Sequence, residues 1–249
     1  MSGHSKWATT KHKKAVVDAR RGKLFAKLLR AIEVAAREGG GSVDGNPTLA
    51  DAVGRARQAS VPGDTIERAV KRGTGELEGV NYETLTYEGY APGGVAVLVQ
   101  ALSDNRNRTA ADVRRCFNKH GGNLSEPGSV AWMFTRRAVV LVPKASVDED
   151  VLLDLALAAG AEDVKAEGDV WEISGAPADL DAQRSAVEAA NLEIVSAEVS
   201  WQPNSTVLLD RPTAERVLRL IDELEDSEDI QEVSANFDVP DDVMAELAG

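Results

Sequence analysis

This 249-residue chain has very little cysteine and no long hydrophobic run. Cys116 is its single cysteine, which excludes an intrachain disulfide and a cysteine-rich zinc site and fits a reducing compartment. The two clearest apolar runs, 95–99 and 138–142, fall far short of the roughly 20 residues that span a bilayer. The basic N-terminal segment also lacks the apolar core of a secretory signal. We therefore expect a cytoplasmic protein that does not cross a membrane.

Histidine and recognisable catalytic motifs are equally scarce. Cys116 lies one residue from the apolar face of a predicted helix, so we expect a small buried side chain and not a nucleophile. His4 and His12 lie among cations, without the cysteine or carboxylate pattern of a metal site. His120 precedes two glycines, a position typical of a helix C-terminus. The sequence therefore predicts no enzymatic activity, no metal and no cofactor.

Charge is distributed very unevenly along the chain. The formal net charge is -13, but residues 1–80 carry 15 Lys+Arg against 9 Asp+Glu, and residues 144–249 carry 6 against 27. The segment between them, 81–143, carries 7 against 5. Within residues 1–30 there are nine basic side chains and a single acid, Asp18. One end of the chain thus suits a polyanion, and the other end repels it.

A helix is predicted in the basic N-terminal region. The apolar residues between 23 and 36 recur at three- and four-residue spacing, until a run of three glycines ends the pattern. Lys27 and Arg30 lie opposite this apolar face, because the helix turns by about 100° per residue. Arg20 joins them only if the helix continues back through Gly22, which costs about 1 kcal/mol relative to alanine.

Two further helices complete a small predicted bundle. Asn46 and Pro47 are a typical N-cap and first residue of the second helix. Asp64 followed by Glu67 resembles a capping box at the start of the third. The third helix carries three cations near its end: Arg68, Lys71 and Arg72.

The segment before these helices, residues 3–14, is basic and has no periodic apolar face. Because packing does not explain its composition, it is typical of an arm that contacts phosphates; the alternative for the helical cations is a solvated surface. Trp7 lies among the cations, where an indole either stacks on a base or anchors the arm to the bundle. The predicted nucleic-acid contacts of the N-terminal region are Lys6, Trp7, Lys11, His12, Lys13, Lys14, Arg20, Arg21, Lys23, Lys27, Arg30, Arg68, Lys71 and Arg72.

The middle of the chain changes to a strand-like pattern. The run 95–99 is typical of a buried strand, and a loop rich in Asn and Arg, 104–109, leads from it into a helix. Arg106 and Arg108 lie beside the free N–H groups of that helix start, where they are candidates for an anion site. A turn with two solvated arginines explains the same residues equally well, because no glycine-rich phosphate loop is present.

From residue 138 the order of elements is strand, helix, strand, strand, helix, strand, which matches a ferredoxin-like unit. The elements after residue 203 are expected to complete the middle sheet. The predicted fold is therefore α+β multidomain, with an N-terminal three-helix domain and two α+β (ferredoxin-like) domains, the third inserted in the second. The predicted domains are 1–80, 81–134 plus 204–249, and 135–203.

An acidic segment, residues 222–229, holds six acids in eight residues and no base. Such a run is usually a solvated loop. Two functional alternatives are that it repels phosphates and so orients the molecule on its target, or that it contacts a basic protein partner.

The sequence resembles the YebC family, and the resemblance covers most of residues 1–134. The motifs that carry it are Gly3-His4-Ser5-Lys6-Trp7, Lys11-His12-Lys13-Lys14, Arg21-Gly22-Lys23-Leu24-Phe25, Ile66-Glu67-Arg68-Ala69, Tyr87-Glu88-Gly89-Tyr90, Asp104-Asn105-Arg106-Asn107-Arg108-Thr109, Lys119-His120-Gly121-Gly122-Asn123-Leu124 and Gly128-Ser129-Val130-Ala131-Trp132-Met133-Phe134. The resemblance implies a three-domain cytoplasmic protein without enzymatic residues. Members are described as DNA-binding regulators, a mitochondrial relative as a translational activator, and bacterial members also as ribosome-assisting proteins.

Charge and resemblance together predict a non-enzymatic nucleic-acid-binding regulator that contacts phosphates through its basic N-terminal domain. A DNA-binding transcriptional regulator is the first form of this prediction. A translation factor that binds ribosomal or transfer RNA is the second, because both targets are polyphosphates. A protein-interaction scaffold acting through the acidic domains is the alternative from another class.

Overall fold

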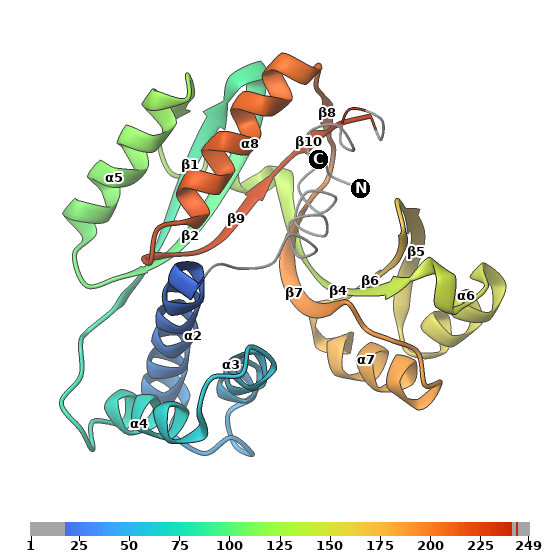
Figure 1. Ribbon diagram of the computed structural model, residues 1–249, viewed down its shortest axis with the longest axis horizontal. Helices are drawn as coiled ribbons and strands as arrows, with labels where there is room; N and C mark the ends of the chain where they lie inside the picture. The colour runs from blue at the N-terminus through green and yellow to red at the C-terminus, as the bar shows by residue number, and fades with distance from the viewer. Residues whose placement is uncertain (1–17, 241–242, 244–249) are drawn as a thin grey trace.

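The computed structural model describes residues 18–240 and residue 243. Figure 1 shows a helical unit followed by two sheet units, each sheet with helices packed on it. The predicted α+β architecture is confirmed. None of the described helices combines the length and apolarity that crossing a membrane requires.

The helical unit has three helices, which lie at α2 Asp18–Gly39, α3 Pro47–Gln58 and α4 Gly63–Thr74. Its core is a cluster of small and branched side chains that includes Ile32, Leu49 and Ile66. Asn46 is the predicted N-cap of α3, since its Oδ1 accepts a hydrogen bond from the Leu49 backbone at 3.1 Å. The predicted bundle is therefore present, with its apolar faces turned inward.

The structure resolves one point that the sequence leaves open in this bundle and corrects another. Helix α2 does continue back through Gly22, so the cost of a glycine inside a helix is tolerated here. The capping box predicted for the third helix is wrong: α4 begins at Gly63 after Pro62, without a side-chain cap. Glu67 pairs instead with Lys71 one turn later, at 2.6 Å.

The first sheet unit is an antiparallel sheet with strand order β3-β1-β2-β9. Its elements are β1 Glu83–Ala91, β2 Val95–Ser103, α5 Arg106–Lys119, β3 Asn123–Leu124, α8 Arg211–Glu225 and β9 Ile230–Ala235. Helices α5 and α8 cover one face, where Val97 packs in the same cluster as Phe117 and Leu220. Leu98 packs on the other face with Phe134. Strand β2 carries the unbroken apolar run 95–99 because both its faces are covered.

The second sheet unit is ferredoxin-like, as predicted. Its elements are β4 Phe134–Pro143, α6 Glu149–Ala158, β5 Ala161–Glu167, β6 Val170–Gly175, α7 Leu180–Ala189 and β7 Ser196–Pro203. The antiparallel strand order is β5-β6-β4-β7. Leu152 of α6 and Val187 of α7 are fully buried in the same cluster as Ile173 of β6.

The chain returns from this second sheet to the first. A short parallel pair, β8 Val207–Leu208 with β10 Phe237–Asp238, flanks α8, and β9 then pairs with β2. The second sheet unit is therefore inserted within the first in chain order. The domain boundaries 1–80, 81–134 plus 204–249, and 135–203 stay a prediction.

The contact between α2 and α4 depends on one glycine. A Cβ at Gly73 would collide with the carbonyl oxygen of Glu33 and lie 2.7 Å from the Ala36 Cβ. We expect Gly73→Ala to lower the free energy of unfolding by about 1–3 kcal/mol, because the two helices must separate. The measurement is urea unfolding followed by circular dichroism.

The matched control for this prediction is Gly54→Ala in α3, where an added Cβ meets no atom within 4 Å. This substitution is expected to raise stability by up to about 1 kcal/mol, because alanine is the better helix former. Equal unfolding midpoints for the two variants would contradict the close approach at Gly73.

Candidate nucleic-acid interface

Part of the predicted interface lies outside the described residues. This holds for Lys6, Trp7, Lys11, His12, Lys13 and Lys14. The backbone of Arg20 and Arg21 lies in α2, so both belong to the helix that carries Lys23, Lys27 and Arg30. The three latter residues form what we call the cationic stripe of α2.

The cationic stripe contacts the acidic segment 222–229. The amino-terminal half of α2 lies beside the turn that joins α8 to β9 (Figure 1). Lys23 Nζ lies 2.6 Å from Asp226 Oδ2, and the Lys27 ammonium donates to the backbone carbonyl of Glu225. Arg30 pairs with Glu228 at 3.3 Å. Lys23, Lys27 and Arg30, which the sequence predicts to contact phosphates, thus contact oxygens of the chain's own acidic residues.

Asp229 is the centre of this contact. Its carboxylate pairs with Arg30 at 2.5 Å and with Arg108 at 2.9 Å, and accepts a hydrogen bond from Thr109 Oγ1 at 2.8 Å. Burial by itself would raise the pKa of the Asp229 carboxyl, but the hydrogen bonds from Arg108, Thr109 and Arg30 outweigh it and hold the pKa below its usual value. Asp229 is therefore ionised and links α2 to the first sheet unit.

The expectation of a solvated acidic loop is wrong for much of the segment. Asp222, Glu223 and Glu225 belong to the last turns of α8, and Asp229 is only 7% exposed. The reason is the chain's own supply of cations, since Lys23, Lys27 and Arg30 of α2 meet this segment. Asp226 and Glu228 stay exposed at the rim of the contact.

The predicted anion site at the start of α5 is occupied by carboxylates. Arg108 pairs with Asp104 at 2.7 Å and with Asp229, while the N-cap Asn105 accepts the Arg108 backbone N–H. Arg106 is exposed and makes no ion pair with another described residue. Both alternatives from the sequence are therefore partly right: one arginine binds an anion, which is internal, and the other faces solvent.

In the second predicted cluster, on α4, two of the three cations have an ion-pair partner within the described part of the chain. Lys71 pairs with Glu67, and Arg72 Nε lies 2.6 Å from Glu33 Oε1. Arg68 is exposed, and no described residue forms an ion pair with it. The helix spacing that places Lys71 on α4 also places Glu67 one turn before it, while the acid beside Arg72 comes from α2.

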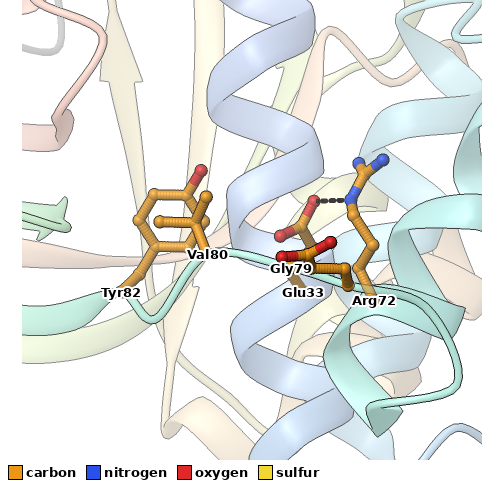
Figure 2. Close-up of a pocket in the computed structure, with 6 residues that line it drawn as sticks. Glu33, Arg72, Gly79, Val80 and Tyr82 are labelled. Atoms are coloured by element: carbon orange, nitrogen blue, oxygen red, sulfur yellow. Dashed lines mark hydrogen bonds and ion pairs between the residues drawn. The ribbon is translucent and has the colours of Figure 1, made fainter.

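A small hollow lies where the helical unit meets the linker that follows it. It has a volume of about 500 Å³ and is lined by Glu33, Arg72, Glu78, Gly79, Val80 and Tyr82. Figure 2 shows Glu33 and Arg72 pointing toward each other, with Val80 and Tyr82 on the linker beside α2. The hollow holds the carboxylates of Glu33 and Glu78 and only one guanidinium, Arg72, which is already paired with Glu33. Its charge is therefore unsuitable for binding phosphate. The hollow marks instead the junction between the helical unit and the first sheet.

Trp132 is an exposed tryptophan that sequence-based reasoning does not identify as a binding residue. It is 71% exposed, and its indole N–H donates to the Ser129 carbonyl at 3.1 Å. The loop that carries it is fixed by the buried Glu88, whose carboxylate accepts backbone N–H bonds from Gly128, Val130 and Ala131 at 2.6 to 2.8 Å. An aromatic side chain that is both exposed and held in place is a candidate for stacking on a base. The motif 128–134 draws attention to this region of the sequence. That Trp132 is exposed, however, depends on the tertiary structure and cannot be read from the motif.

Cys116 is buried, as expected. Its side chain packs between α5 and α8 near His120 and Glu223. Burial raises the pKa of the Cys116 thiol to about 12. His120 Nε2 lies 2.7 Å from Glu223 Oε2, and Lys119 Nζ lies 2.6 Å from the same oxygen, so this carboxylate is already satisfied. The arrangement supports a structural role for the cysteine. His120 is the C-cap of α5, as its place before two glycines predicts, and its ring contacts the Glu223 carboxylate.

Family profiles match most of the chain. Residues 5–76 match the TACO1/YebC protein N-terminal domain, and residues 82–237 match the TACO1/YebC second and third domain. The boundary between the two matches falls in the linker between α4 and β1.

Individual relatives are similar over their full lengths. Proteins from Beutenbergia cavernae and Rubrobacter xylanophilus, each named probable transcriptional regulatory protein, are 58% and 56% identical. The alignments cover 99% of both chains in the first case and 100% of both in the second. The crystal structure of a conserved hypothetical protein, Aq1575, from Aquifex aeolicus is similar with a TM-score of 0.81 at 47% identity, covering 91% of this chain and 93% of that one.

The Asp229 contact predicts a pH-dependent loss of stability. We expect Asp229→Ala to lower the free energy of unfolding by about 2 kcal/mol at neutral pH, because Arg30, Arg108 and Thr109 lose a charged partner. The pKa of the folded Asp229 carboxyl lies below its ordinary value of 3.8, so its contribution is present above pH 3.8 and is lost as the pH falls through the folded pKa.

The measurement is urea unfolding of wild type and variant at neutral pH and below pH 3.8. The difference between the two proteins should shrink at the lower pH. A difference that stays constant across this range would show that Asp229 does not act through its charge.

Proposed function

This chain belongs to the TACO1/YebC family, and we propose that it is a non-enzymatic regulator that binds nucleic acid through its basic N-terminal region. The observation that carries the proposal is the distribution of charge: nine cations and one acid in residues 1–30, against 6 cations and 27 acids in residues 144–249. A duplex or a folded RNA presents a dense row of phosphates, which attracts the first region and repels the second.

The cations of the arm are the proposed main contacts. The set comprises Lys6, Lys11, Lys13 and Lys14, with Trp7 and His12 between them and Arg20 and Arg21 at the start of α2. Arg68 and Arg106 add two exposed cations that have no ion-pair partner among the residues described. Phosphate contacts position a protein on nucleic acid without reading its sequence. We therefore propose that these residues supply binding affinity, and we assign no base sequence that they recognise.

A DNA-binding transcriptional regulator is the first form of this proposal. The relatives from Beutenbergia cavernae and Rubrobacter xylanophilus carry the name probable transcriptional regulatory protein, which supports a regulatory role in transcription. The buried, high-pKa Cys116 and the internally paired His120 support the non-enzymatic part of the proposal. We place this activity in the cytoplasm.

A translation factor that binds RNA on the ribosome is the second form. The observation that favours it is Trp132, an exposed and fixed indole. Unpaired bases stack on such side chains, and RNA recognition most often uses unpaired bases, whereas bases in a DNA duplex are already stacked on each other.

Removing arm cations should weaken binding in a salt-dependent way. With about five phosphates neutralised, log affinity for duplex DNA falls with log salt at a slope near -4.5 in wild type. We expect replacement of Lys11, Lys13 and Lys14 by glutamine to weaken binding and to make the slope shallower by about 0.9 for each phosphate that is no longer neutralised. Fluorescence anisotropy over a salt series measures both.

The matched control removes three exposed cations from elsewhere: Lys165→Gln, Arg184→Gln and Arg219→Gln. This variant has the same net charge as the arm variant and should bind with the wild-type slope. If the control loses as much affinity as the arm variant, net charge decides binding and the arm has no special role.

Trp132→Ala separates the two forms of the proposal. If a base stacks on the indole, the variant loses about tenfold in affinity for single-stranded RNA, since one stacked base is worth about 1–3 kcal/mol. Binding to duplex DNA is expected to stay unchanged. Trp132→Phe, which keeps an aromatic face, is the control and should retain RNA binding. Equal RNA affinity for all three proteins would remove the support for the second form.

Co-sedimentation with ribosomes, compared with a mobility shift on duplex DNA at the same salt concentration, then identifies the stronger target. The salt concentration must be equal in the two assays, because each affinity depends steeply on it.

A further inference from the structure

We propose that the acidic segment 222–229 occupies the cationic stripe of α2 and that nucleic acid must displace it before the stripe can contact phosphates. This inference rests on the proposed function and names a regulation of the same basic region. It assigns to the acidic segment a part that neither the family profiles nor the names of the relatives describe: an internal competitor for the nucleic-acid phosphates.

The contact places oxygens where phosphate oxygens would otherwise bind. Three successive cations on one side of α2 each meet an oxygen of the acidic segment: Lys23 at the Asp226 carboxylate, Lys27 at the Glu225 carbonyl, and Arg30 at the Glu228 and Asp229 carboxylates. Arginine and lysine bind carboxylate and phosphate oxygens with the same donors. While this contact persists, the stripe cannot add to the phosphate contacts of the arm.

The interface is polar, so it can open without exposing a hydrophobic core. The apolar cluster of the helical unit contains residues of α2, α3 and α4 and the loop between them. The cluster of the first sheet unit contains residues of that unit alone. Among the described residues, no buried apolar cluster spans the two. Interfaces of this kind between parts of one chain commonly permit relative motion.

The covalent connection between the two units also suits such a motion. Residues 75–82 join α4 to β1 and contain Gly75, which has a φ of 81°, and Gly79. Arg37 donates to the Val80 carbonyl at 2.8 Å and to Asn81 Oδ1 at 2.6 Å. This linker is thus held to α2 by exposed hydrogen bonds, while the stripe is held to the first sheet unit by ion pairs.

The strength of the contact fits a competitor that can be displaced. Lys23, Asp226 and Glu228 have side chains between 40% and 55% exposed, and ion pairs at such exposure are individually weak. Arg30 with Asp229 is the more buried pair, at 16% and 10% exposure. A nucleic acid offers several phosphates at once. Once the arm has bound one phosphate, the next lies close to the stripe at a high local concentration and can compete with the acidic segment.

The test removes the two exposed acids and leaves Asp229 in place. Asp226→Asn with Glu228→Gln frees Lys23 and one side of Arg30, and neither residue is part of a buried cluster. The control, Asp154→Asn with Glu193→Gln, removes the same two charges from exposed positions of the second sheet unit. Binding is measured on a short fluorescent duplex DNA and on a single-stranded RNA over the same salt series.

The expected result is that the Asp226/Glu228 variant binds about three- to tenfold more tightly than wild type. Its salt slope on duplex DNA should be steeper by about one to two units, since each freed cation that neutralises a phosphate adds about 0.9. The control should bind as wild type does, because a screening length of about 8 Å limits the reach of distant charges.

The alternative results are distinguishable. If the Asp226/Glu228 variant and the control give the same affinity and slope, the inference is overturned while the proposed function stands. If neither wild type nor any variant binds duplex DNA or RNA, the proposed function fails and the inference falls with it.

A second measurement follows the contact itself in the wild-type protein. The Lys23 amine and the Asp226 carboxylate are 2.6 Å apart, so a carbodiimide should join them directly. We expect mass spectrometry to detect this cross-link in the free protein and to find it reduced when saturating duplex DNA is present. A cross-link of equal yield with and without DNA would contradict displacement, provided that anisotropy confirms binding.

Discussion

The attraction between the cations of α2 and the acidic segment 222–229 is the interaction on which the arrangement of this molecule depends. Asp229 is its centre, because Arg30 reaches it from the helical unit while Arg108 and Thr109 reach it from the start of α5. A buried carboxylate with two arginines is stable only as a set, since removing one member leaves the others unpaired. Within the described residues, the helical unit is therefore held to the first sheet unit by charged contacts, and no buried apolar cluster contains residues of both.

The sheet units are built on the opposite principle. In the first, β2 is buried on both faces, and α5 and α8 cover one of them (Figure 1). In the second, α6 and α7 pack on an antiparallel sheet around Ile173. These cores resist change, since apolar clusters open only at a large cost in exposed surface. The molecule thus combines an acidic body, which has two apolar cores, with a basic unit that is attached by polar contacts and a linker.

Glu88, like Asp229, is a buried carboxylate that accepts several hydrogen bonds. It fixes a loop within the first sheet unit, whereas Asp229 joins two units. Glu88 is 5% exposed, and three backbone N–H groups of the Trp132 loop bind its two oxygens. Burial by itself would raise the pKa of the Glu88 carboxyl, but these backbone bonds lower it. Glu88 lies in a motif of the sequence and Asp229 in its acidic segment, but neither position shows which donors will bind the carboxylate. Each is important because of the donors that the fold brings to it.

Periodicity, capping and composition are local properties, and they were enough to predict the α+β class, the ferredoxin-like order of the second sheet unit, the N-cap at Asn46 and the separation of charge between the two ends. They could not predict that Lys23 meets Asp226, 203 positions away, that Arg72 is bound by Glu33, or that Trp132 faces solvent. These pairings exist only in the folded chain. The physical reason is that a charge pattern shows where cations and acids are abundant, whereas the partner of each depends on which distant elements the packed cores bring within hydrogen-bond distance.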